Sequence, residues 1–265
     1  MRDDEFFKDT PRKPLDMEGE TIEFPVLYYD LRTITAIFTA RSSKLKKLLP
    51  HPNCKPVEML PGVGMLGVTC FEYYDTSIGP YNEIAITIPM KFPPGFQLPG
   101  WEALKMMLTK DFFVYIRHLP VTTEIALRAG IYFWNYPKFL SEIIFEDRGD
   151  KLEVSLKEKG ELILKLSARK LPLTTSSKFI FHTYSYKDGV VMHAPVEGWA
   201  PKFGSVTLGR GFAELELGEH PISQELRELG LSSVARTGFY GEGTMTKLYD
   251  PDQRWKADTL ELISG

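Results

Sequence analysis

The chain has 265 residues, of which 43% are hydrophobic and 25% are charged, as in an ordinary globular protein rather than a disordered or fibrous one. Its formal net charge of -3 gives no overall attraction to nucleic acid or to an anionic membrane, so neither is expected as a partner. Two cysteines, Cys54 and Cys70, form no CxxC motif and are typical of a reducing compartment.

The first 20 residues are charged and contain two prolines, so we expect an arm on the surface of this subunit or of a neighbouring one. The N-terminus lacks the apolar core of a secretory signal, and no later stretch resembles a membrane span. These features predict a cytoplasmic protein. Residues 21–40 are rich in β-branched and aromatic types and are expected to form strand, with a break or bulge at 30–32.

The rest of the first half is expected to combine strands with short helices. Helices are predicted over 41–49, over 102–109, and from a cap at Thr122 or Thr123 to Gly130. Strands are predicted over 57–60, 65–74, 82–90 and 112–117, and the proline-rich stretch 91–101 is expected to be a loop.

The second half is more uniformly β. Strands are predicted over 140–146, 152–156, 162–168, 179–186, 190–194, 205–217 and 241–249, with one helix over 223–229. No internal repeat or linker is visible, so residues 1–265 are expected to form a single domain. The predicted fold class is α+β, mainly antiparallel β: a meander that closes or nearly closes into a barrel with a central cavity and a few short helices.

The segment from Gly130 to Phe139 contains the first candidate for covalent catalysis. Lys138 stands there among Trp134, Tyr136 and Phe139, and poor hydration among aromatic rings penalises the ammonium form in favour of the nucleophilic amine. The simpler interpretation is that Lys138 ends a turn and extends into water. Lys91, also between apolar residues, is the rival lysine.

Two other motifs give weaker predictions. Residues 62–67 satisfy GxGxxG, but a proline precedes them and β-rich sequence follows, so the strand and helix of a dinucleotide site are missing. A two-residue turn at 188–189 would set His193 diagonally across from His182, with Glu197 one step further, as possible zinc or iron ligands. This arrangement depends on an assumed register, and such residues are more often structural.

Two motifs together resemble the acetoacetate decarboxylase family. The segment from Gly130 to Lys138, with Tyr136-Pro137-Lys138 at its end, is similar to the family's Gly-(six residues)-Pro-Lys segment, whose lysine forms a Schiff base. The segment from Asp75 to Glu83, which reads DTSIGPYNE, is similar to the family's Asp-Thr-Ser...Gly-x-Tyr-x-Glu segment, with one residue fewer in the turn. A weaker similarity covers 41–50.

The resemblance implies catalytic roles for Lys138 and Glu83. The family's first-strand arginine, thought to meet the substrate carboxylate, would correspond to Arg32 with a one-residue insertion and to Leu31 without it. Phe139 replaces the second lysine of the best-known members, and Thr69 stands where another active-site glutamate would fall. Desolvation would then be the main means of obtaining a neutral amine. Arg32, Tyr136, Phe139 and Trp134 are the expected substrate-binding residues.

The leading hypothesis is a carboxy-lyase that uses Lys138 to decarboxylate a small 3-oxo acid such as acetoacetate. The iminium is the electron sink, so no organic cofactor or metal is expected, and the resemblance implies a homo-oligomer. One alternative is an imine-dependent aldolase or dehydratase acting on an oxo acid such as pyruvate. Another is a barrel that only binds a small ligand, with Lys138 pairing to its anionic group.

Overall fold

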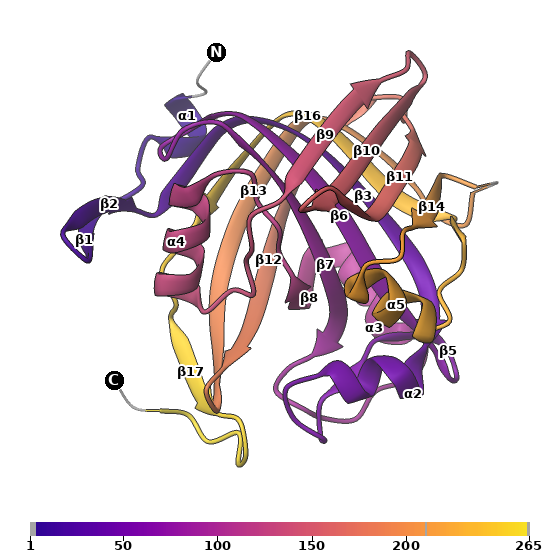
Figure 1. Cartoon of the computed structure of the whole chain (residues 1–265). Helices are drawn as coiled ribbons and strands as arrows, with labels where there is room; N and C mark the ends of the chain where they lie inside the picture. The colour runs from indigo at the N-terminus through magenta and orange to yellow at the C-terminus, as the bar shows by residue number, and fades with distance from the viewer. Residues whose placement is uncertain (1–3, 210, 264–265) are drawn as a thin grey trace.

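The computed structural model describes residues 4–209 and 211–263, and this part of the chain contains a closed barrel of seven strands. Around the barrel the order is β7, β8, β12, β13, β16, β3 and β6, and β6 pairs with β7 to close it (Figure 1). All neighbours are antiparallel except β8 and β12. The bounds are β3 (Val26–Arg41), β6 (Val63–Thr76), β7 (Tyr81–Lys91), β8 (Asp111–His118), β12 (Thr175–Lys187), β13 (Val190–Val206) and β16 (Thr237–Leu248). The predicted fold class is confirmed.

A second sheet stands beside the barrel, which the prediction of one continuous meander did not anticipate (Figure 1). Its order is β15 (Val234–Ala235), β14 (Ala213–Leu217), β11 (Glu161–Arg169), β10 (Lys151–Glu158) and β9 (Glu142–Asp147). Strand β10 buries Leu152, Val154 and Leu156 and turns the residues between them outward. Such a one-sided apolar strand suits either a barrel or a separate sheet, so alternation alone cannot decide between them.

Two large hydrophobic cores result from this arrangement. Ile34 and Phe38 face outward from β3 and pack with Leu152 and Val154 of the second sheet. Leu31 of the same strand belongs to the other core, which includes side chains from the barrel interior. Burial of both faces explains why the longest barrel strands are so rich in apolar residues.

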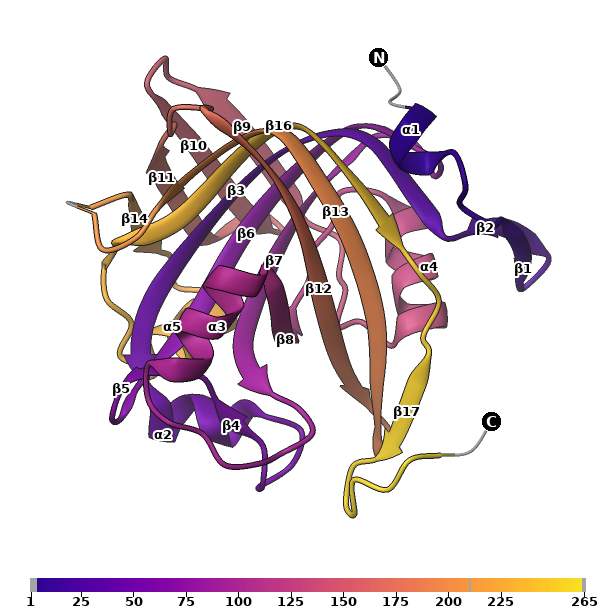
Figure 2. The same cartoon turned by 180° about the vertical axis from the view of Figure 1, so that it is seen from behind.

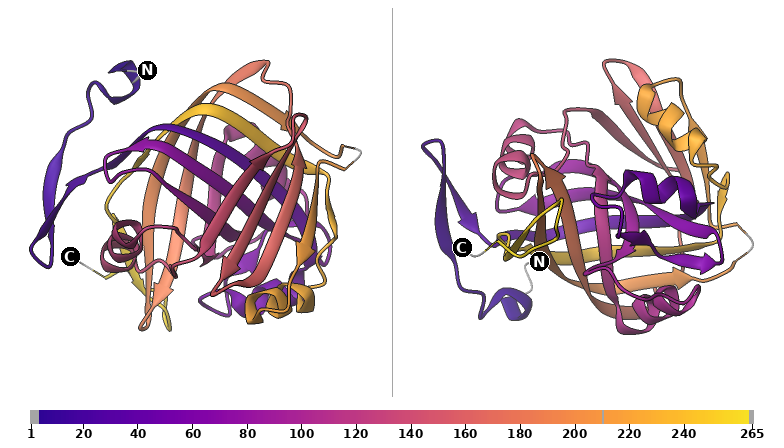
Figure 3. Two further views of the ribbon diagram at one scale, coloured as in Figure 1. Left: turned by 45° about the horizontal axis from the view of Figure 1, so that its top comes forward. Right: turned by 90° about the horizontal axis from the view of Figure 1, so that it is seen from below.

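The remaining elements are short. The helices are α1 (Asp4–Phe7), α2 (Ser42–Leu45), the 3-10 helix η1 (Lys46–Leu48), α3 (Trp101–Thr109), α4 (Glu124–Trp134) and α5 (Pro221–Glu228), and the other strands are β1 (Lys13–Met17), β2 (Glu20–Phe24), β4 (Lys55–Pro56), β5 (Glu58–Leu60) and β17 (Gln253–Lys256). Strands β1 and β2 form a hairpin that extends from the barrel (Figures 2 and 3). Among residues 4–209 and 211–263, no helix is long and apolar enough to cross a membrane.

An ion-pair cluster joins helix α5 to the barrel. Glu225 accepts hydrogen bonds from Arg117 and contacts His118 Nε2 at 2.9 Å, both on β8. Burial alone would raise the pKa of Glu225, but the bonds to His118 and Arg117 outweigh it and lower the pKa from 4.5 to about 2. Because folding lowers this pKa, the cluster stabilises the fold fully above pH 4.5, and the contribution is lost as the pH falls through about 2.

We expect Glu225→Gln to remove this pH dependence. The difference between 4.5 and about 2 corresponds to at most about 3 kcal/mol in the free energy of unfolding at neutral pH. Urea unfolding between pH 7 and pH 2 should show a smaller decline in the variant than in the wild type. The matched control is Glu228→Gln on the exposed side of the same helix, which should retain the wild-type decline. Equal declines in Glu225→Gln and wild type would contradict the assignment.

Candidate active site

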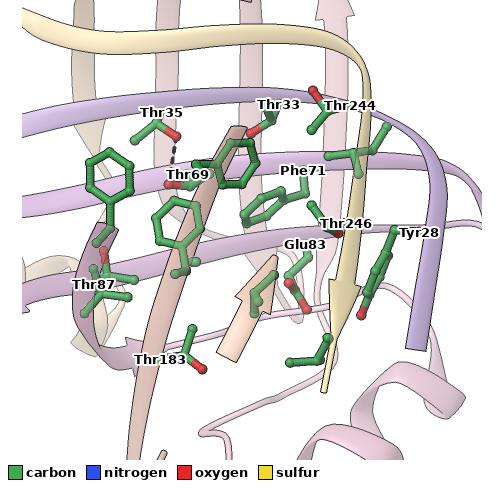
Figure 4. A pocket seen from close by; sticks show the side chains of 18 of the residues that line it. Tyr28, Thr33, Thr35, Thr69, Phe71, Glu83, Thr87, Thr183, Thr244 and Thr246 are labelled. Carbon is green, nitrogen blue, oxygen red and sulfur yellow. Dashed lines mark hydrogen bonds between the residues drawn. The ribbon is translucent and has the colours of Figure 1, made fainter. Parts of the chain in front are cut away.

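The barrel encloses a cavity of about 130 Å³. Its walls are largely apolar and include six phenylalanine side chains: Phe71, Phe112, Phe179, Phe181, Phe203 and Phe239. Glu83, on β7, is the one carboxylate on this wall among the described residues, and it points inward near Tyr28 (Figure 4). A single acidic group in apolar surroundings is a feature of reactive sites more often than of packing cores.

The end of helix α4 brings Lys138 to Glu83. Asn135 adopts a left-handed conformation with φ 51°, and the Tyr136 N–H donates to the Gly130 carbonyl at 3.1 Å, which closes the last turn. Pro137 prevents the helix from continuing. The chain therefore reverses over the helix, and the Lys138 side chain passes directly across Gly130.

Gly130 is required by this path. A Cβ atom built on Gly130 would lie 2.4 Å from both Cδ and Cε of Lys138 and 3.2 Å from its Nζ. Distances under 3.0 Å cannot be tolerated, so any larger residue would displace the lysine. The glycine that begins the motif eight residues before Lys138 thus provides the space for the lysine side chain.

Lys138 and Glu83 form a buried pair. The Lys138 Nζ lies 2.7 Å from Glu83 Oε2, and the two side chains are only 6% and 9% exposed. Glu83 lines the cavity, whereas Lys138 lies behind it and is not among the lining residues. The amine is therefore buried, as expected, and in direct contact with a carboxylate.

Three tyrosines surround this pair. Tyr73 donates to Glu83 Oε1 at 3.3 Å, Tyr81 donates to Tyr28 at 3.2 Å, and the Lys138 ammonium lies 5.9 Å from the centre of the Tyr81 ring. Burial and then the charge of Glu83 raise the pKa of all three phenols, which therefore stay protonated. Tyr28 lines the cavity, and its hydroxyl accepts the hydrogen bond from Tyr81.

Arg32 does not face the cavity, which corrects its expected role in substrate binding. Its guanidinium bonds to Glu72 Oε2 at 2.6 and 2.9 Å and to Asp147 at 3.2 Å, on the side of β3 that faces the second sheet. The neighbouring Leu31 lines the cavity instead. The predicted irregularity is present, because the β3–β6 register shifts at Asp30, and a one-residue shift exchanges the faces of a strand.

The aromatic residues near Lys138 have different positions. Tyr136 lines the cavity as expected, with its hydroxyl 2.7 Å from Thr183 Oγ1. Trp134 is not a lining residue: it stacks on Tyr136 and donates its indole N–H to the Tyr249 carbonyl. Phe139 packs against the other core, between barrel and second sheet. Trp134, the last residue of helix α4, and Phe139 therefore do not border the cavity, which corrects the substrate-binding roles expected for them.

The histidine pair has the predicted register without forming a convergent metal site. His182 pairs with Pro195, and His182 Nδ1 lies 3.1 Å from His193 Nε2. The other His193 nitrogen contacts Asp252, while Glu197 accepts from Tyr249 and lies too far along the strand to join them. Within the described residues no group of three potential ligands surrounds a common point.

The tyrosine cluster was missed at the level of sequence. Tyr28, Tyr73 and Tyr81 lie on three different strands, far from Lys138 in the chain. Tyr81 and Tyr73 share the inward side with Glu83, at distances of two and ten residues. The alternation of β7 could have indicated Tyr81 once Glu83 was placed inward, but nothing in the sequence indicated Tyr28.

Comparison with known proteins now identifies the family. Residues 10–254 match the family model described as acetoacetate decarboxylase (ADC). The chain belongs to the acetoacetate decarboxylase family. A comparison with curated proteins found no match. Membership supports an enzyme of the acetoacetate decarboxylase type, and the motifs around Lys138 and Glu83 belong to the matched region.

Solved structures share the fold at low identity. Acetoacetate decarboxylase from Legionella pneumophila subsp. pneumophila str. Philadelphia 1 has a TM-score of 0.66 and 14% identity, covering 99% of this chain and 94% of that one. The enduracididine biosynthesis enzyme MppR, solved with pyruvate, has a TM-score of 0.55 and 11% identity, covering 88% of this chain and 91% of that one. These identities establish a common fold alone.

Positions at which the sequence departs from the acetoacetate decarboxylase pattern lie on the cavity wall. Leu31, the position obtained without an insertion, faces the cavity, and so does Thr69, which bonds to Thr35 at 3.1 Å. Glu72 faces away with Arg32 and cannot replace the missing glutamate. The wall has apolar or hydroxyl side chains where charged residues were expected from the family.

Proposed function

We propose that the protein is a lysine-dependent decarboxylase of 3-oxo acids in which Lys138 forms a Schiff base with the substrate ketone. The observation that carries this proposal is the buried contact of 2.7 Å between Lys138 and Glu83, beside the cavity. Transfer of a proton from the ammonium to the carboxylate gives a neutral amine and a neutral acid without changing the net charge. Glu83 can therefore generate the nucleophile and hold the proton needed later.

In the proposed reaction the neutral Lys138 amine attacks the ketone carbon, and a proton from Glu83 assists the loss of water as a protonated imine forms. The bond to the carboxylate carbon then breaks, its electron pair moves to the iminium, and carbon dioxide leaves. The resulting enamine is protonated on carbon by a proton taken up from water, which balances the proton that decarboxylation of the acid anion consumes. Water finally hydrolyses the imine, which releases the shortened ketone and the free lysine.

The surroundings of the substrate carboxylate favour this bond cleavage. With Arg32 facing away, the proposed contacts to the carboxylate come from hydroxyl groups such as that of Tyr28. An anion that is weakly solvated by the wall loses its charge as carbon dioxide departs, so an apolar wall assists the transition state more than the ground state. The electron pair left behind by the departing carbon dioxide then neutralises the iminium within the site.

A reaction of the same imine without decarboxylation is the second candidate. The fold is similar to that of MppR, whose structure was solved with pyruvate, and an aldol or dehydration reaction would use the same lysine. The two candidates differ in their products, because only decarboxylation releases carbon dioxide from acetoacetate.

Borohydride trapping tests the Schiff base directly. Reduction in the presence of acetoacetate, followed by peptide mapping, is expected to place the adduct on Lys138, with carbon dioxide evolved in the unreduced reaction. Lys91 is the internal control, since its side chain is 34% exposed and bonds to Glu102 and to the Phe96 carbonyl. An adduct on Lys91, or no adduct with acetoacetate or any longer 3-oxo acid, would refute the proposal. Trapping with pyruvate without carbon dioxide release from acetoacetate would favour the second candidate.

A further inference from the structure

The cavity has two parts that differ in chemistry. Around Glu83 three of the lining aromatic side chains, Tyr28, Tyr73 and Tyr136, carry hydroxyl groups, and Phe71 stacks on Tyr73. Farther from Lys138 the aromatic side chains lack hydroxyl groups: Phe112, Phe179, Phe181, Phe203 and Phe239. A ligand that fills both parts must have a polar, reactive head and an apolar remainder.

The five phenylalanines form one continuous surface. Ring centres are separated by 5.5 Å between Phe179 and Phe181, and by 5.1 Å between Phe181 and Phe112. They are separated by 5.9 Å between Phe112 and Phe239, and by 5.8 Å between Phe239 and Phe203. Rings from four strands thus make an unbroken apolar wall, and all five border the cavity rather than being covered by other side chains.

Several hydroxyl groups in this wall are paired within the protein, whereas the buried hydroxyls of Thr33 and Thr244 have no hydrogen-bond partner among the described residues. Thr35 and Thr69 bond to each other at 3.1 Å (Figure 4), and Thr183 bonds to Tyr136 and to the Ala194 carbonyl. A hydroxyl that already has a partner does not need one from a ligand. Thr35, Thr69 and Thr183 therefore present mainly their methyl groups beside the phenylalanine rings.

The cavity is longer than a four-carbon acid. On β12, Thr183 next to Tyr136 and Ser177 at the far end both contribute to the lining, and six residues of strand span roughly 20 Å. The cavity's volume of about 130 Å³ is about the size of a cavity that binds one benzene ring, roughly 150 Å³, so a longer chain must extend toward the open end. Acetoacetate extends only a methyl group beyond its ketone and would leave the phenylalanine wall uncovered.

The far end of the cavity meets the protein surface. Lys110 and Phe179 border both the cavity and a second, outer cleft beside Phe6 and Trp199. The Lys110 ammonium lies 5.9 Å from the centre of the Phe239 ring. An apolar chain whose head is at Lys138 would follow the phenylalanines and end near this opening.

We infer that the substrate is a 3-oxo acid whose ketone carries an apolar substituent of about five carbons or a phenyl ring, which lies along the phenylalanine wall toward the open end of the cavity. This inference rests on the proposed function of Lys138. The 3-oxo acid head lies between Glu83 and Tyr28, and the substituent lies along Phe181, Phe112 and Phe239.

A chain-length series tests the inference. Carbon dioxide release is measured for acetoacetate, 3-oxohexanoate, 3-oxooctanoate and 3-oxo-3-phenylpropanoate. We expect kcat/KM to rise about fourfold for each methylene buried, and on the order of 100-fold from acetoacetate to 3-oxooctanoate. A flat or declining series, with the Lys138 imine still trapped by borohydride, overturns the apolar substituent and leaves the proposed function in place. Failure of trapping with every acid overturns the proposed function itself.

Two variants separate binding of the chain from a general defect. Ser177→Phe should obstruct the far end of the cavity and reduce the ratio of kcat/KM for 3-oxooctanoate to that for acetoacetate by roughly tenfold. Ser176→Phe, at the adjacent exposed position, is the matched control and should retain the wild-type ratio. The same ratio in both variants would contradict the inference.

Binding can also be measured without the reaction. Lys138→Met cannot form an imine, so calorimetric titration of this variant with heptan-2-one and with acetone reports on the wall alone. Heptan-2-one is expected to bind at least tenfold more tightly. Equal affinities would argue against the apolar substituent whether or not the Schiff base forms.

Discussion

Turnover is expected to fall by at least about 10⁴-fold when Lys138 is replaced by arginine, because a guanidinium keeps the positive charge but cannot form a Schiff base. Lys138→Met should have the same effect for a different reason, since it keeps an unbranched side chain one atom shorter and removes the amine. The measurements are carbon dioxide release from acetoacetate and from the preferred longer acid, together with borohydride trapping of each variant.

The control for this prediction is Lys91→Met, which removes the partly exposed lysine that bonds to Glu102 and should leave turnover within about twofold of wild type. Circular dichroism spectra of all variants establish whether they are folded. Substantial turnover by folded Lys138→Arg would exclude covalent catalysis by this residue. If the wild type and the variants bind ligand but none of them shows turnover, the non-catalytic binding barrel is favoured instead.

Gly130→Ala is expected to lower kcat by about 100-fold while leaving the protein folded. The new Cβ would lie 2.4 Å from Cδ and Cε of Lys138, so the lysine must move, and a displacement of about 1 Å can cost this much in rate. The helix itself gains from the change, since alanine is favoured over glycine by up to about 1 kcal/mol in a helix interior. Activity should therefore fall while thermal stability rises or stays constant.

Gly95→Ala provides a matched comparison. Its Cβ would lie 3.5 Å from Cε of Lys91, an ordinary contact next to the other lysine, so neither rate nor stability should change appreciably. Steady-state kinetics and thermal unfolding of the two variants give the required contrast. Wild-type kcat in Gly130→Ala would show that the position of Lys138 over this glycine is unimportant for catalysis.

Local sequence was sufficient to indicate the reactive residues. Lys138 follows a proline after a helix with a glycine at the right spacing, and Glu83 ends a motif beginning at Asp75, so short stretches contain both. Most strands were also correctly expected, because β-branched and aromatic residues in alternation describe a strand whatever its neighbours are. The turn at 188–189 even predicted the pairing of His182 with Pro195.

Only the tertiary structure determines which way each side chain faces and which residues it contacts. Arg32 and Leu31 differ by one position, and the register shift at Asp30 determines which of them enters the barrel. Tyr28 and Glu83 come from segments that are distant in the chain. These segments approach one another only when β6 and β7 close the barrel. A strand with one apolar face fits either sheet equally well, so the separation of β9 to β11 from the barrel required long-range packing.

The chemistry of the site divides in the same way. The sequence alone shows that the chain is rich in aromatic residues and contains a lysine of the acetoacetate decarboxylase type. Only the fold determines that Glu83 contacts this lysine, that Arg32 is excluded, and that five phenylalanines from four strands surround one cavity. The reason is physical: a nucleophile can be indicated by its neighbours along the chain, whereas a cavity is formed by side chains that are distant in sequence and share only the inward face of a closed sheet.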